Sequence, residues 1–119
     1  MAAPKVHAQV TEYLVSAVPI EYGDSHHFAL YVQWRGGDRW CVADAQNGAT
    51  GVLNADGEWE WEPLPSERRE DFLARTRFDH DTAFQMALKA APKVTVNGYT
   101  VEDGIRMQAA RKARREARP

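Results

Sequence analysis

The 119-residue sequence has a single cysteine, Cys41, so no disulfide can form within the chain. Long apolar runs are also missing. The most apolar stretch, residues 13–18, includes Ser16 and is far shorter than the roughly 20 residues that a membrane-spanning helix needs. No basic start followed by an apolar run marks a secretory signal. We therefore expect a cytoplasmic protein with one packed core and no membrane insertion.

Catalytic motifs are missing as well, since the chain has no P-loop, no GxGxxG and no GxSxG pattern. Four residues have donor types that suit a divalent metal: His26, His27, His80 and Asp81. They lack the spacing of a zinc site, and adjacent histidines on a predicted strand point to opposite faces. Cys41 lies within a predicted strand, which favours a buried structural thiol over a nucleophile. We therefore predict no catalytic residue, metal ligand or cofactor; a small metal-dependent or hydrolytic enzyme is a further alternative.

Charge is abundant but unevenly distributed. Residues 106–119 carry a formal charge of +5, whereas residues 56–71 carry −5. Contact between these segments, within the chain or between two copies, would satisfy both and makes a homodimer plausible. Five basic side chains fall within one arc of about 160° on a helical wheel: Arg111, Lys112, Arg114, Arg115 and Arg118. They are candidates for binding a protein partner or nucleic acid, and a solvated helix end is the third interpretation.

Hydrophobic periodicity changes from two residues to the helical period near residues 63–65. Runs of β-branched and aromatic residues predict strands over residues 10–18, 27–35 and 39–44, and a further hairpin within residues 52–62. The order of elements is therefore strands first and helices second.

Helix starts are predicted at Ser66, at Asp79 or Asp81, and at Thr100, because each can cap the backbone N–H groups of a first turn. The expected fold is α+β. It has an antiparallel meander of four or five strands, followed by two or three helices packed on one face, the last of them basic.

Three parts of the chain are expected. Residues 1–9 form an N-terminal arm, residues 10–105 form a single α+β domain, and residues 106–119 form a basic helical tail. Only the middle part has the apolar clusters that a core requires.

Residues 36–37, a pair of glycines, predict a two-residue hairpin turn, because both can adopt positive φ. This register pairs Val32 with Cys41. It gathers five apolar side chains on one face: Phe28, Leu30, Val32, Trp34 and Cys41. Tyr31 and Trp40 then lie on the opposite face, where either a helix or a partner covers them. We therefore select Tyr31 and Trp40 as candidate partner-binding residues.

Strict alternation over residues 58–62 (EWEWE) places glutamates on one side of a strand and two tryptophans on the other. Because glutamate prefers water and tryptophan is usually buried, we expect Trp59 and Trp61 to be buried and the glutamates to be solvated. If the tryptophans were exposed instead, they would become the first candidates for a binding surface.

The sequence of residues 57–68 (GEWEWEPLPSER), followed by 72–78 (FLARTRF) and 81–83 (DTA), resembles small uncharacterised proteins of actinobacteria and their phages. The resemblance covers residues 10–103. It implies an accessory protein of a phage or its host. The missing catalytic motifs, the aromatic residues and the segregated charge together predict a small interaction module that binds a protein partner, with a homodimer as one option. A nucleic-acid-associated protein is the alternative.

Overall fold

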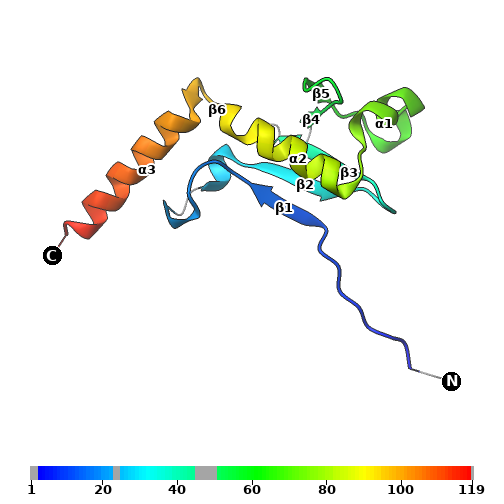
Figure 1. Ribbon diagram of the computed structural model, residues 1–119, viewed down its shortest axis with the longest axis horizontal. Coiled ribbons are helices and arrows are strands. Elements are labelled where there is room, and N and C mark those ends of the chain that lie inside the picture. The colour runs from blue at the N-terminus through cyan, green and yellow to red at the C-terminus, as the bar shows by residue number, and fades with distance from the viewer. Residues whose placement is uncertain (1–2, 23–24, 45–50, 119) are drawn as a thin grey trace.

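The computed structural model describes residues 3–22, 25–44 and 51–118. Five strands form one antiparallel meander in the order β1-β2-β3-β4-β5, so β1 and β5 are its edges (Figure 1). The strands are β1 (Glu12–Val15), β2 (Leu30–Trp34), β3 (Trp40–Asp44), β4 (Gly51–Leu53) and β5 (Trp59–Trp61). Helices follow the sheet in the chain, which confirms the predicted α+β class.

The second half of the chain is mainly helical. Its α-helices are α1 (Glu70–Thr76), α2 (His80–Ala90) and α3 (Val101–Glu116). Short 3-10 helices in the described part of the chain connect elements: η1 (Ile20–Tyr22), η2 (Ser25–Phe28), η4 (Pro65–Glu67) and η5 (Ala91–Lys93). A small hairpin of β6 (Thr95–Val96) and β7 (Tyr99–Thr100) leads into α3.

Two of the predicted helix starts are confirmed. Asp79 begins α2, and its carboxylate accepts a hydrogen bond of 2.8 Å from the backbone N–H of Thr82. Thr100 and Asp103 form a capping box at the start of α3, in which each side chain accepts a hydrogen bond from the backbone N–H of the other. Ser66, the third predicted start, lies in η4 instead.

The hairpin between β2 and β3 differs from the prediction by one residue. Trp34 pairs with Trp40, and the N–H of Arg35 donates to the carbonyl of Arg39 at 2.8 Å. The loop is therefore residues 36–38. Both of its glycines have positive φ, as predicted, at 97° and 54°. The sequence identified the turn correctly, but two glycines that allow positive φ do not fix the loop length.

This one-residue shift exchanges the two faces of β3. Trp40 lies on the same face as Leu30 and Val32, whereas Cys41 lies on the opposite face. The predicted placement of Trp40 and Cys41 was therefore wrong. Tyr31 is half-buried and lies on the same face as Cys41, so the structure separates Tyr31 from Trp40.

Helices cover both faces of the sheet rather than one. On the α2 face, a core cluster joins strand residues to three helical alanines: Val15, Leu30, Val32, Trp40, Val42, Leu53, Ala83, Ala87 and Ala91. On the α1 face, Cys41 and Val52 pack against Phe72 of α1. A third cluster of Val18, Phe28 and Val101 attaches the first half of α3 to the segment between β1 and β2. The small alanines let α2 approach the sheet closely.

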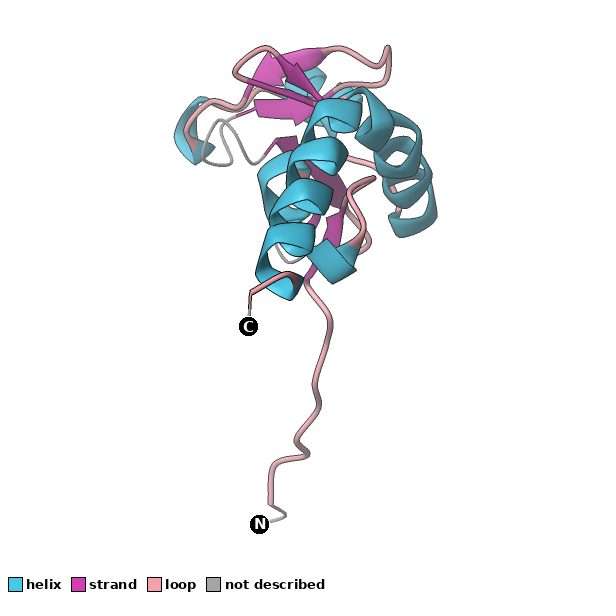
Figure 2. Cartoon of the chain, turned by 90° about the vertical axis from the view of Figure 1, so that its left-hand side faces the viewer, coloured by secondary structure: helices cyan, strands magenta, loops and turns pink. Residues whose placement is uncertain are grey.

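The molecule is elongated. Its Cα radius of gyration is 17.5 Å, whereas a compact chain of this length has about 13–14 Å. Two segments account for the difference: α3 lies at one end of the molecule, and residues 3–10 extend away from the body in both views (Figures 1 and 2). Within the described part of the chain, no helix is both long and apolar enough to span a membrane.

Candidate partner-binding surface

Strand β5 faces the opposite way from the prediction. Trp59 and Trp61 are 42% and 71% exposed, while the following Glu62 is only 9% exposed. Glu60 and Glu62 point to the α1 face, and both indoles point to the α2 face, beyond the end of the core cluster. The expectation of buried tryptophans and solvated glutamates was therefore wrong, although the alternation itself was correct.

Glu62 is buried because three arginines surround it. Its carboxylate lies 2.5 Å from Arg77, 3.0 Å from Arg35 and 3.6 Å from Arg68. The side chains of Glu62 and Arg77 are each only 5% exposed. A buried charge is tolerated only when it is paired and hydrogen-bonded, and this cluster meets both conditions.

Glu60 is held in the same way, nearer the surface. Arg75 of α1 donates to both carboxylate oxygens of Glu60 at 2.7–3.0 Å, and the side-chain amide of Asn54 donates at 2.8 Å. The hydrogen bonds from Arg75, then those from Asn54, lower the pKa of Glu60 below its ordinary value. The glutamates of β5 thus bind α1 to the sheet, and Arg75 also lies over the ring of Phe72.

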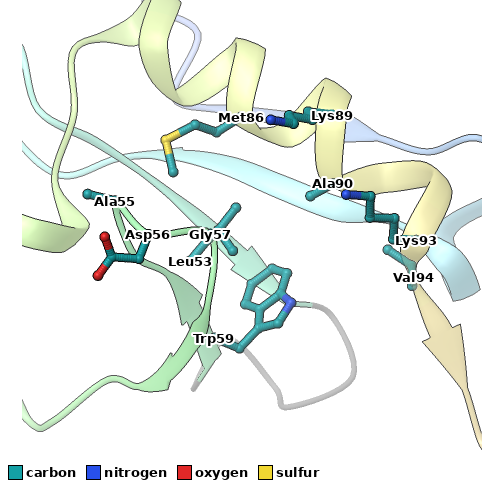
Figure 3. Close-up of a pocket in the computed structure, with 10 residues that line it drawn as sticks. All are labelled: Leu53, Ala55, Asp56, Gly57, Trp59, Met86, Lys89, Ala90, Lys93 and Val94. Atoms are coloured by element: carbon teal, nitrogen blue, oxygen red, sulfur yellow. The ribbon is translucent and has the colours of Figure 1, made fainter.

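With the glutamates turned inward, the tryptophans form a surface. Trp59 lines an open hollow of about 380 Å³ between the β4–β5 hairpin and α2 (Figure 3). Five other apolar residues share this lining: Leu53, Ala55, Met86, Ala90 and Val94. Asp56, Lys89 and Lys93 supply the charged groups. We call Trp59, Trp61 and this hollow the tryptophan surface.

Strand β5 also offers a free edge. The N–H of Asn54 donates to the carbonyl of Glu58 at 2.8 Å, and in an antiparallel pair such bonds recur at every second residue. The backbone of Glu60 therefore faces β4, and the N–H and C=O groups of Trp59 and Trp61 face away from it. Among residues 3–22, 25–44 and 51–118, no backbone group forms a hydrogen bond with these outward groups. The edge and the tryptophan surface lie side by side.

Trp40, a predicted partner-binding residue, belongs to the core. It is 7% exposed, and its ring lies 5.9 Å from that of Tyr13 and 5.0 Å from that of His80. Its backbone also forms a two-way bridge with Phe78, in the link between α1 and α2. Helix α2 covers Trp40, so this indole is inaccessible to a partner in this fold. In the sequence, the feature that could have predicted exposed tryptophans at positions 59 and 61 is the set of arginines that pair with the neighbouring glutamates.

The basic residues lie on the second half of α3, which is one continuous helix through residue 106. Gln108, Arg111, Arg114, Arg115 and Arg118 line a shallow hollow of about 270 Å³. Lys112 is half-buried and lies 3.9 Å from Glu116. The carboxamide oxygen of Gln108 is buried and has no hydrogen-bond partner among the described residues. The acidic segment lies around β5 and α1, at the other end of the molecule (Figure 1), so the two charged segments do not pair within one chain.

The described histidines do not assemble into a metal site, and the side chain of His26 lies outside the described part of the chain. His80 lies in α2, where Nδ1 is 3.1 Å from Asp81 and the ring packs against Tyr13, Trp40 and Phe84. His27 is exposed in η2, outside the strand that was predicted for it. The described residues contain no cluster of three metal-ligating side chains.

No family model, curated protein or solved structure matches this chain. Function is therefore inferred from the molecule's own surfaces. Of these, the tryptophan surface combines exposed aromatic rings, a hollow and unpaired strand backbone.

Proposed function

We propose that the chain is a small interaction module that binds an extended segment of a protein partner along β5. The observation that carries this proposal is the exposure of Trp59 and Trp61 beside a free strand edge. Tryptophan is enriched among the residues that dominate interface energies, and an exposed sheet edge binds extended peptides by adding a strand.

The outward backbone groups of β5 and the adjacent hollow support an extended partner segment. An added antiparallel strand would form hydrogen bonds with the outward backbone groups of Trp59 and Trp61. Its alternate side chains would then lie on the tryptophan side of the sheet, where the hollow beside Leu53 and Met86 accepts an apolar group. The occupant is therefore an extended segment with apolar residues at every second position.

A selection of displayed random nine-residue peptides on the full chain tests this proposal. We expect enriched peptides with alternating apolar residues that bind wild type and fail to bind the Trp59→Ala/Trp61→Ala variant. Leu88→Gln is the matched control, because it removes an exposed apolar side chain of α2 outside the hollow. Peptides that bind the tryptophan variant as tightly as wild type would overturn the proposal, and so would a selection that enriches none.

A second candidate function is nucleic-acid binding by α3. Arg114, Arg115 and Arg118 are exposed, and each such cation can neutralise a phosphate. Binding of a labelled DNA duplex at about 50 mM salt should be lost when these three arginines become glutamine, and the affinity should fall steeply toward about 200 mM salt. Changing Lys5, Arg39 and Arg69 to glutamine alters the net charge equally and should leave binding intact. Equal loss in both triple variants would show an effect of net charge alone.

A further inference from the structure

We propose that the segment that pairs with β5 is residues 3–10 of a second copy of this chain, the extended stretch before β1, which we call the arm. The inference rests on the proposed function of β5 as a site for an extended segment. It names the source of that segment and makes the interaction one between identical chains.

The arm has the pattern that β5 requires. Val6, Ala8 and Val10 are exposed and alternate with polar residues, so an extended arm has one apolar side. Val6 is 97% exposed, so its side chain has almost no contact with the rest of the chain. Pro4 lies near the start of the arm, where a missing N–H is tolerated in an edge strand. The arm therefore has the conformation and side-chain pattern of a β-strand but pairs with no strand among the described residues.

The arm cannot readily reach β5 of its own chain. It precedes β1, at the opposite edge of the five-stranded sheet, and four inter-strand spacings of about 4.8 Å separate the two edges by about 19 Å. At about 3.4 Å per residue, that crossing would use about six of the eight arm residues and leave too few to form a strand. The helices on both faces also block a direct path. A second copy removes this restriction.

The two partners match chemically. When the apolar side of the arm faces the indoles, the residue opposite Glu60 is His7 or Gln9, and neither side chain brings a negative charge next to this carboxylate. The arm carries one basic residue, Lys5, and no acidic residue. The turn before β5 exposes Asp56 and Glu58. Residues 3–10 therefore add no negative charge to this acidic part of the sheet, and the alternation of their apolar side chains matches that of the two indoles.

Sedimentation of the full chain across a concentration series tests the assignment. We expect wild type to self-associate, and we expect Val6→Asp/Val10→Asp and Trp59→Ala/Trp61→Ala each to weaken the association by at least about tenfold. The Leu88→Asp control places a similar charge at an exposed apolar position of α2 and should associate as wild type does. A wild type that stays monomeric up to about 1 mM would overturn the assignment, and so would an arm variant that associates like wild type.

Mixing the two defective variants gives the decisive result. The arm variant retains a native β5 and the tryptophan variant retains a native arm, so the mixture should form a complex through one intact contact. Non-specific hydrophobic association of the exposed valines and tryptophans would not restore a complex in the mixture. A mixture that stays monomeric overturns the arm assignment. If displayed peptides still require Trp59 and Trp61 while the arm results fail, the proposed function stands and only the source of the segment changes.

Discussion

Glu62 is a charged residue in a position that its neighbours in sequence predict to be solvated. It has three arginine neighbours, of which only Arg68 is close in sequence; Arg35 comes from the end of β2 and Arg77 follows α1. Together they replace the water that the carboxylate loses on burial. The burial of this residue is therefore a property of the assembled fold.

Replacing Glu62 with alanine should lower the free energy of unfolding by about 3–5 kcal/mol, the usual cost of leaving a buried partner charge unpaired. Arg77 would be the group left without a countercharge, since its side chain is 5% exposed. Denaturant unfolding measures the change, with Glu58→Ala, an exposed residue, as the control. A loss of less than about 0.5 kcal/mol would contradict the role of Glu62 in the buried cluster.

Replacing the tryptophans with alanine should change the free energy of unfolding by very different amounts at different positions. Trp61→Ala should change the free energy of unfolding by about 0.5 kcal/mol or less, because this side chain is exposed. Trp40→Ala should cost about 3–5 kcal/mol, because it empties part of the core. Trp59 lies between, at less than about 2 kcal/mol. Urea midpoints test this order, and equal losses at positions 40 and 61 would be incompatible with it.

Glu60 should make stability depend on acid pH. Its pKa in the folded protein lies below its ordinary value of 4.5 because Arg75 and Asn54 donate to the carboxylate. The unfolded chain therefore binds the proton first as the pH falls. The stabilisation is present above the unfolded pKa and is lost as the pH falls through the folded pKa. Between about pH 6 and pH 3, the free energy of unfolding should fall more for wild type than for Glu60→Gln. Parallel curves would show that Glu60 contributes nothing.

At the scale of elements, the sequence predicted the order and type of structure well, because those depend on local pattern. The strands, Asp79 at the start of α2 and the capping box at Thr100 all follow from residues that lie close together in the chain. The sequence failed where the choice depends on distant partners. The facing of β5 is decided by Arg75 and Arg77, and alternation alone does not reveal that choice.

Helix α3 depends on one close contact. A methyl group added at Gly104 would lie 2.5 Å from Cε2 of Phe28, which is itself buried. Gly104→Ala should therefore destabilise the protein by about 1–3 kcal/mol through overpacking, even though alanine favours helices by about 1 kcal/mol over glycine. Thermal unfolding, with Met107→Ala on the exposed side of the same helix as control, measures the balance. A stabilised Gly104→Ala protein would show that Phe28 moves aside freely.

At the scale of the whole molecule, the basic half of α3 is separate from the core. The last residue of α3 in a core cluster is Ile105, and only Gln108 is buried after it. Changing Arg114, Arg115 and Arg118 to glutamine should therefore leave the thermal midpoint of unfolding unchanged. A fall equivalent to more than about 1 kcal/mol would show that these side chains support the fold as well as any binding.

The inward glutamates of β5 also have a consequence for the order of folding. The β4–β5 hairpin is local and closes quickly, but on its own it lacks the arginine ion pairs that hold Glu60 and Glu62 on the α1 face. Arg75 and Arg77 follow the hairpin in the chain, and they reach Glu60 and Glu62 only after α1 has formed. We therefore expect β5 to be the last strand to settle into its native pairing. Until then we expect the strand to pair in either facing, with its indoles or its glutamates on the α1 face. Formation of α1 then fixes the native facing, because it brings Arg75 and Arg77 to the glutamates.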